Sequence, residues 1–174
     1  GMLYITTGDV TAKPPTNAQD TKSLSGKILR VTAEGKVPPD NPFGNEVWSY
    51  GHRNVQGIAW DSAGRMYASE FGSNRLDELN LIRRGGNYGW PAAEGPANDR
   101  RFIDPLLTWR TREASPSGIA ITPDGTVLIA SLRGERLWAT SRQGEGMMPP
   151  EVYLDGVGRL RAVEFVRGEL WLLT

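Results

Sequence analysis

The sequence predicts an all-β fold, and three observations support this prediction. Short strand-like apolar runs recur along the whole chain, as at residues 27–32 and 136–140. No segment keeps apolar residues at the three-to-four spacing of an amphipathic helix over ten residues. Apolar runs led by a glycine also repeat, and they read GMLYITT from Gly1, GRMYASE from Gly64, GTVLIAS from Gly125 and GELWLLT from Gly168.

The repeat is a strand, a tight turn and a second strand. The runs at Gly64 and Gly125 each follow a matching segment, GIAWDSAG at residues 57–64 and GIAITPDG at residues 118–125. A shorter version spans residues 161–168. Short strands with glycine, proline and aspartate turns, repeating every 40 to 60 residues or so, are typical of propeller blades, which are four-stranded sheets around a central channel. The sequence therefore predicts a β-propeller.

Further strands and loops complete the expected blades. The additional strands are expected at residues 47–50, 76–82, 106–110 and 152–154. Long loops at residues 10–23 and 35–45 are candidates for function, because binding residues are often carried by loops on rigid sheets. Residues 94–101 and 142–150 are expected to be solvent turns. Since residues 1–7 and 168–174 occupy the same place in the repeat, residues 1–174 are predicted to form a partial β-propeller domain, truncated at both ends and holding about three blades.

The composition excludes several classes of protein. A chain of 174 residues with 39% hydrophobic residues can form a core, so a globular domain is expected. Twenty basic and twenty acidic residues cancel, which argues against a nucleic-acid partner. Cysteine is absent, so disulfides and thiolate metal sites are excluded. No window approaches the length of apolar residues that a membrane span needs.

Two polar clusters lie beside strand-like runs and are candidates for chemistry. The first, residues 51–54 (GHRN), places a fixed cation next to an amide that can donate and accept. The second, residues 70–74 (EFGSN), ends a strand with a glycine that lets backbone carbonyls approach a ligand. Both clusters are expected at the rim of a pocket.

These clusters resemble motifs of a known family. GHRN, EFGSN, DELNLI at residues 77–82 and GGNYGWP at residues 85–91 resemble the soluble aldose sugar dehydrogenases that use pyrroloquinoline quinone (PQQ), a group that includes soluble quinoprotein glucose dehydrogenase. Shorter matching pieces are TTGD from Thr6, SGKILR from Ser25, DNPF from Asp40, SPSG from Ser115, SLR from Ser131 and RLR from Arg159. The resemblance implies a six-bladed β-propeller that oxidises the anomeric hydroxyl of an aldose to a lactone, with hydride transfer to PQQ. It also implies calcium, an external electron acceptor and a periplasmic or secreted location.

The resemblance implies a set of cofactor-binding arginines. The positions that match the family's PQQ contacts are Arg53, Asn54, Arg133, Arg159 and Arg161. Arg53 would supply a permanent cation where negative charge develops on the quinone. Arg159 and Arg161, which are expected to alternate along one face of a strand, would bind its carboxylates through bidentate forks, and Arg133 stands where the family commonly has lysine. Ala162 stands where an aspartate is usual after the second arginine of RLR. The alternatives are a salt bridge between blades for Arg53 and solvated side chains for the other three arginines.

Calcium is implied at two places. The backbone carbonyls of Gly72 and Ser73 match the ligands of the calcium beneath the cofactor, and calcium prefers such hard oxygen ligands. Glu78, with the carbonyl of Tyr88, matches a second calcium site. The alternatives are a plain left-handed turn at Gly72 and ordinary surface charges at Asp77 and Glu78.

One carboxylate matches the catalytic machinery, whereas the base itself is missing. Asp9 matches the residue that orients the family's catalytic histidine, and that histidine lies upstream of the TTGD strand. The chain as given is therefore expected to be inactive by itself. His52, the only histidine, is expected to be structural. Two other functions stay open, a cofactor-free extracellular binding propeller and a calcium-dependent hydrolase of the lactonase type, although the arginines around the predicted pocket disfavour both.

Overall fold

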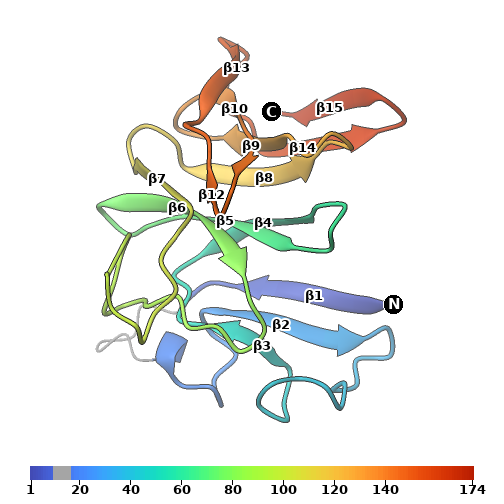
Figure 1. Cartoon of the computed structure of the whole chain (residues 1–174), viewed down its shortest axis with the longest axis vertical. Helices are drawn as coiled ribbons and strands as arrows, with labels where there is room; N and C mark the ends of the chain where they lie inside the picture. The colour runs from blue at the N-terminus through green and yellow to red at the C-terminus, as the bar shows by residue number, and fades with distance from the viewer. Residues whose placement is uncertain (10–16) are drawn as a thin grey trace. The chain divides into compact units, whose positions relative to one another are not determined.

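A computed structural model describes residues 1–9 and 17–174, and its regular structure is almost entirely β (Figure 1). Among these residues the single helical element is a 3-10 turn, η1 (Asn17–Gln19). The all-β prediction is therefore confirmed. Residues 10–16, the first half of the predicted loop at residues 10–23, lie outside the described residues. The described part of the chain contains no helix long and apolar enough to cross a membrane.

The strands follow one another in antiparallel sheets. In chain order they are β1 (Met2–Thr7), β2 (Lys27–Thr32), β3 (Val47–Tyr50), β4 (Val55–Trp60), β5 (Met66–Glu70), β6 (Leu76–Ile82), β7 (Leu107–Arg110), β8 (Pro116–Ile121), β9 (Val127–Ser131), β10 (Arg136–Thr140), β11 (Arg142–Gln143), β12 (Gly146–Met147), β13 (Glu151–Asp155), β14 (Ala162–Val166) and β15 (Glu169–Leu173). Two sheets have four strands, in the orders β4-β5-β6-β7 and β8-β9-β10-β13. The others are β1-β2-β3, β14-β15 and the small hairpin β11-β12. Four-stranded meanders repeated along the chain are blades of a β-propeller, as predicted.

The contacts divide the chain into two compact units. The first comprises Gly1–Val55 and Ile82–Asp104, and it contains the sheet β1-β2-β3. The second comprises Gln56–Leu81 and Pro105–Thr174, and it contains the remaining sheets. The strand β4 begins one residue before the second unit, and β6 ends one residue beyond it.

The core of the second unit lies between successive sheets. One cluster joins the two four-stranded sheets through residues that include Tyr67, Leu79 and Ile129. A second cluster joins the sheet of β8 to the hairpin β14-β15, with the buried side chains of Leu137 and Val163 among its members. Both faces of the sheet of β8 are therefore covered by apolar side chains, which explains the continuous burial of β9.

The first strands of the three successive sheets approach each other closely. A Cβ atom on Gly57 of β4 would lie 2.6 Å from the backbone oxygen of Ser117 in β8. A Cβ atom on Gly118 would lie 2.7 Å from the Cα of Ala162 in β14, and the amide of Gly118 donates to the carbonyl of Arg161 at 2.9 Å. The glycine of the repeated GIA motif is thus required by backbone packing between sheets.

Two details differ from the sequence-based expectation. Residues 142–150, expected to be a plain solvent turn, contain the short hairpin β11-β12. Arg159 and Arg161 were expected to alternate along a strand, but both precede β14, which begins at Ala162. Their alternation is retained, because Leu160 between them is fully buried while both arginines are exposed.

Candidate functional site

In the first unit, Asp9 lies next to the polar cluster between β3 and β4. Its backbone amide donates to the carbonyl of Arg53 at 2.8 Å. The preceding residue, Gly8, lies so close to Asn54 that an added Cβ would be 3.2 Å from the amide oxygen. The structure therefore brings three predicted site residues together, Asp9 from the end of β1 and Arg53 and Asn54 from the β3–β4 loop.

The carboxylate of Asp9 has one engaged and one open oxygen. Its Oδ2 accepts a hydrogen bond from the indole Nε1 of Trp90 at 2.8 Å. Its Oδ1 is buried and has no hydrogen-bond partner among residues 1–9 and 17–174. Sequence reasoning missed Trp90, because 81 residues separate it from Asp9 and no local pattern joins the two.

His52 is part of the core of the first unit. It is fully buried, its ring stacks on Tyr88 with 4.6 Å between centroids, and its Nε2 lies 2.9 Å from the hydroxyl of Ser49. Its backbone amide donates to the carbonyl of Gly26. These contacts suit the structural role expected of it.

A buried lysine accompanies Asp9. The ammonium of Lys27 donates to three backbone carbonyls, those of Asn17 at 2.8 Å, Ala18 at 3.0 Å and Ser25 at 2.6 Å. Burial lowers the pKa of Lys27 to about 8, and the negative charge of Asp9 opposes this shift. Lys27 is thus a fixed donor that anchors the turn at η1 against β2.

In the second unit, Asp77 fixes the loop that carries Gly72 and Ser73. Asp77 is almost fully buried, and its Oδ1 accepts from the amide of Gly72 at 3.0 Å. Its Oδ2 accepts from the amide of Ser115 at 2.7 Å, which ties the β5–β6 loop to the start of β8. The role of Asp77 was missed from the sequence, because the burial of both faces of β6 depends on the fold, and a buried carboxylate needs hydrogen-bond donors.

Glu78 belongs to a buried polar group on β5 and β6. Asn80 Nδ2 donates to Glu78 Oε2 at 3.0 Å and to Glu70 Oε2 at 3.2 Å. Asn80 Oδ1 is buried without a hydrogen-bond partner. The reading of Asp77 and Glu78 as ordinary surface charges is therefore wrong, since their exposed fractions are 1% and 8%. Tyr88, the other residue predicted for this calcium site, belongs to the first unit.

The three remaining predicted arginines gather near the start of β14. The amide of Leu160, between Arg159 and Arg161, donates to the carbonyl of Ser131 at 3.1 Å. This hydrogen bond places both arginines beside Ser131, the last residue of β9. Arg133 follows Ser131 by two residues. All three arginines are exposed.

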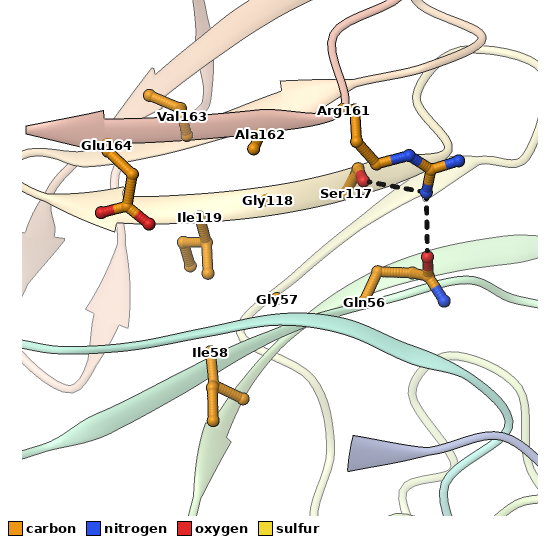
Figure 2. A pocket seen from close by; sticks show the side chains of 10 residues that line it. All are labelled: Gln56, Gly57, Ile58, Ser117, Gly118, Ile119, Arg161, Ala162, Val163 and Glu164. Atoms are coloured by element: carbon orange, nitrogen blue, oxygen red, sulfur yellow. Dashed lines mark hydrogen bonds between the residues drawn. The ribbon is translucent and has the colours of Figure 1, made fainter. Parts of the chain in front are cut away.

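A pocket of about 410 Å³ lies on the first strands of the three sheets of the second unit (Figure 2). Gly57 and Gly118 line it together with apolar side chains, and Arg161 and Glu164 lie at opposite ends. Arg161 turns towards β4 and β8, where one guanidinium nitrogen lies 3.3 Å from Gln56 Oε1 and 3.4 Å from Ser117 Oγ. Sequence reasoning missed Gln56 and Ser117 as partners of this arginine.

The pocket has the size of a small-molecule site, and its lining includes one cation. Its volume lies within the range of about 300 to 1,000 Å³ that is usual for small-molecule sites. The two contacts of Arg161 use one nitrogen of a group that carries five N–H donors, so donors are left for a carboxylate. The lining thus offers one cation to a bound carboxylate, and Glu164 adds a negative charge at the other end.

Acidic side chains do not form a metal centre by themselves. Within residues 1–9 and 17–174, no group of three or more histidine, cysteine, aspartate or glutamate side chains is arranged to hold a metal ion.

Fold and site together define a β-propeller protein with a pocket, lined in part by Arg161, on the first strands of successive sheets. The chain belongs to the Glucose / Sorbosone dehydrogenase family, whose model matches residues 1–174. The predicted family is thereby confirmed.

Solved and curated relatives agree with this assignment. The PQQ-bound aldose sugar dehydrogenase of Streptomyces coelicolor is 52% identical, with a TM-score of 0.93 over 99% of this chain and 52% of that chain. The soluble aldose sugar dehydrogenase of Escherichia coli, in its apo form, is 28% identical, with a TM-score of 0.83 over 99% of this chain and 57% of that chain. Quinoprotein glucose dehydrogenase B of Acinetobacter calcoaceticus is 46% identical over 90 residues, which are 49% of this chain and 19% of that protein. The chain thus spans about half the length of these two solved relatives.

Proposed function

We propose that the full-length protein oxidises the anomeric hydroxyl of an aldose to a lactone and transfers hydride to PQQ. The observation that carries this proposal is the pocket on β4, β8 and β14, in which Gln56 and Ser117 hold the guanidinium of Arg161. Membership in the Glucose / Sorbosone dehydrogenase family and the likeness to a PQQ-bound aldose sugar dehydrogenase support it.

The residues of the second unit would bind the cofactor. Arg161, Arg159 and Arg133 would meet its carboxylates, because a guanidinium fork matches a carboxylate in geometry and charge. Gln56 and Ser117 take the place of the missing aspartate at position 162, since they orient Arg161 with neutral acceptors. When bound, PQQ supplies an ortho-quinone that accepts the hydride.

The residues of the first unit would act on the reacting atoms. Arg53 would keep a fixed cation beside the quinone oxygen that gains negative charge, and Asn54 would donate a hydrogen bond there. Asp9 would orient the histidine that takes the proton from the sugar hydroxyl. The half-buried Arg53 loses part of its hydration in the fold, which strengthens its interaction with developing charge.

Calcium would bind the backbone carbonyls of Gly72 and Ser73. Their loop is fixed by the buried carboxylate of Asp77, so the carbonyls would require little rearrangement. A second calcium would use the carboxylate of Glu78. The unpaired oxygen of Asn80 beside Glu78 supports a cation there, because a buried acceptor without a donor is costly.

The test is single-turnover reduction of bound PQQ by an aldose in the full-length protein loaded with calcium. In Arg53→Ala the rate of reduction should fall about 100-fold or more, the size of effect seen when one preorganised donor is removed, while PQQ affinity changes only a few-fold. Arg101→Ala is the matched control, since its side chain is 76% exposed and pairs with Asp99 in a turn.

The outcomes separate the proposal from its rivals. Normal reduction in Arg53→Ala would show that this role of Arg53 is wrong. Sugar binding without PQQ binding would favour a cofactor-free binding propeller, and calcium-dependent hydrolysis of a lactone would favour the hydrolase. We also expect a periplasmic or secreted location and an external electron acceptor, which cell fractionation and assays with artificial acceptors would check.

A further inference from the structure

Hydrogen bonds of its backbone hold Trp90 in place, in addition to the hydrogen bond from its indole to Asp9. Its backbone amide donates to the carbonyl of Gly51 at 2.9 Å, and its carbonyl accepts from Gln19 Nε2 at 2.7 Å. Gln19 and Asn87 are joined by two reciprocal amide hydrogen bonds of 3.0 and 2.9 Å. The position of Trp90 is therefore set by the fold of the first unit, independently of Asp9.

The same network leaves no room for adjustment at Gly51. Its φ of +76° favours glycine, and a Cβ atom there would collide with the amide oxygen of Asn87. An added Cβ would also lie 2.9 Å from the amide nitrogen of Gly89, which itself donates to Asn87 Oδ1 at 3.0 Å. The loop that carries Trp90 is thus locked against the β3–β4 connection.

Two hydrogen bonds fix Asp9, one at its carboxylate and one at its backbone amide. The indole N–H of Trp90 occupies Oδ2 at 2.8 Å, and the amide of Asp9 is bound to the carbonyl of Arg53. With the backbone and one oxygen fixed, the carboxylate cannot rotate without breaking a hydrogen bond. Its Oδ1 is buried and accepts no hydrogen bond from residues 1–9 or 17–174, so it can accept one from another donor.

We propose that Trp90 is a positioning residue for proton transfer. By occupying Oδ2, Trp90 leaves Oδ1 as the carboxylate oxygen that accepts no hydrogen bond within the described part of the chain, and so directs Oδ1 to the N–H of the catalytic base. This inference rests on the proposed function, because it requires that Asp9 orients a histidine. It goes beyond that function in assigning the orientation to an indole 81 residues away in the chain.

The experiment compares Trp90→Phe with wild type in the full-length protein loaded with PQQ and calcium. We expect kcat to fall about tenfold or more, because poor orientation of the base would lose a part of the roughly 100- to 10,000-fold that a general base contributes. The Kd for PQQ should stay within about twofold, since Trp90 acts on proton transfer. Trp48→Phe is the matched control in the same unit, since its indole packs against Tyr4 and Arg30 away from Asp9, and it should keep the wild-type kcat.

Two further measurements distinguish positioning from a general loss of structure. In an Asp9→Asn background the additional effect of Trp90→Phe on kcat should vanish, because Trp90 acts through the carboxylate. The indole N–H resonance of Trp90 should exchange slowly with solvent in wild type and faster in Asp9→Ala. If Trp90→Phe does not fold, benzothienylalanine at position 90 keeps the shape of the side chain and removes the N–H donor.

Each outcome decides one point. Wild-type protein that binds PQQ but shows no sugar-dependent reduction would overturn the proposed function, and this inference with it. Active wild type together with unchanged kcat in Trp90→Phe or in the benzothienylalanine variant would overturn this inference alone. Additive effects of the Trp90 and Asp9 substitutions would also overturn it.

Discussion

Gly118→Ala tests whether close approach between the first strands of successive sheets holds the second unit together. The added Cβ would lie 2.7 Å from Ala162 Cα and 3.1 Å from the amide nitrogen of Val163, and both are backbone atoms that cannot move by a rotamer change. Ordinary carbon contacts are about 3.5 to 4.0 Å, so the strands must separate by roughly 1 Å. That movement would lengthen the 2.9 Å hydrogen bond from Gly118 to Arg161 beyond bonding distance.

The expected loss of stability follows from these two effects. Overpacking costs about 1 to 3 kcal/mol, and the lost hydrogen bond adds about 1 kcal/mol. Alanine also restricts the unfolded chain, which offsets about 0.4 to 1 kcal/mol of this loss. The free energy of unfolding should therefore fall by about 1 to 3.5 kcal/mol.

Urea denaturation followed by tryptophan fluorescence would measure this loss. Gly146→Ala is the matched control, because the nearest atom to its added Cβ is 3.9 Å away and its φ lies outside the left-handed region. It should change the free energy of unfolding by no more than about 0.5 kcal/mol. Equal stability of the two variants would refute the argument that packing between sheets requires glycine at position 118.

Three other predictions concern charged and polar groups. Ser117→Ala should weaken PQQ binding about three- to tenfold in equilibrium titration, since it removes one of the two contacts that orient Arg161. Ser117→Thr should restore the affinity, and unchanged affinity in the alanine variant would contradict this role. Asp77→Asn should lower the free energy of unfolding by about 2 kcal/mol, because two amides lose a charged acceptor, and an unchanged urea midpoint would count against it. Because burial lowers the pKa of Lys27 from 10.5 to about 8, the unfolded chain binds more protons than the folded chain between these values. The stability of wild type relative to Lys27→Met should therefore rise with pH in that window, by up to about 1.4 kcal/mol per pH unit, and a constant difference from pH 8 to 10 would refute it.

Local features of this fold could be predicted because they depend on neighbouring residues. The strand at residues 27–32 and the strand at residues 136–140 agree with β2 and β10, since apolar runs between turn residues identify strands locally. The hairpin β11-β12 was missed, because two-residue strands leave almost no pattern. Arg159 and Arg161 were found by resemblance, and their exposure on either side of buried Leu160 follows from simple alternation.

The partners of the site residues could not be predicted in the same way. Arg161 meets Gln56 across 105 residues and Trp90 meets Asp9 across 81, and nothing in either local sequence specifies the other. Asp77 was misread as a possible surface charge, because its burial depends on what covers both faces of β6.

By itself, the sequence determined the all-β class, the repeated hairpins and the family, because periodicity, turn residues and motif order are properties of the chain. Only the tertiary structure decided why the repeated glycines at positions 57 and 118 are needed, which groups orient Arg161, and which oxygen of Asp9 is open. The physical reason is that close backbone contacts and hydrogen bonds between distant segments depend on how the sheets and loops pack, and packing distances of a few tenths of an ångström are not encoded in any local pattern.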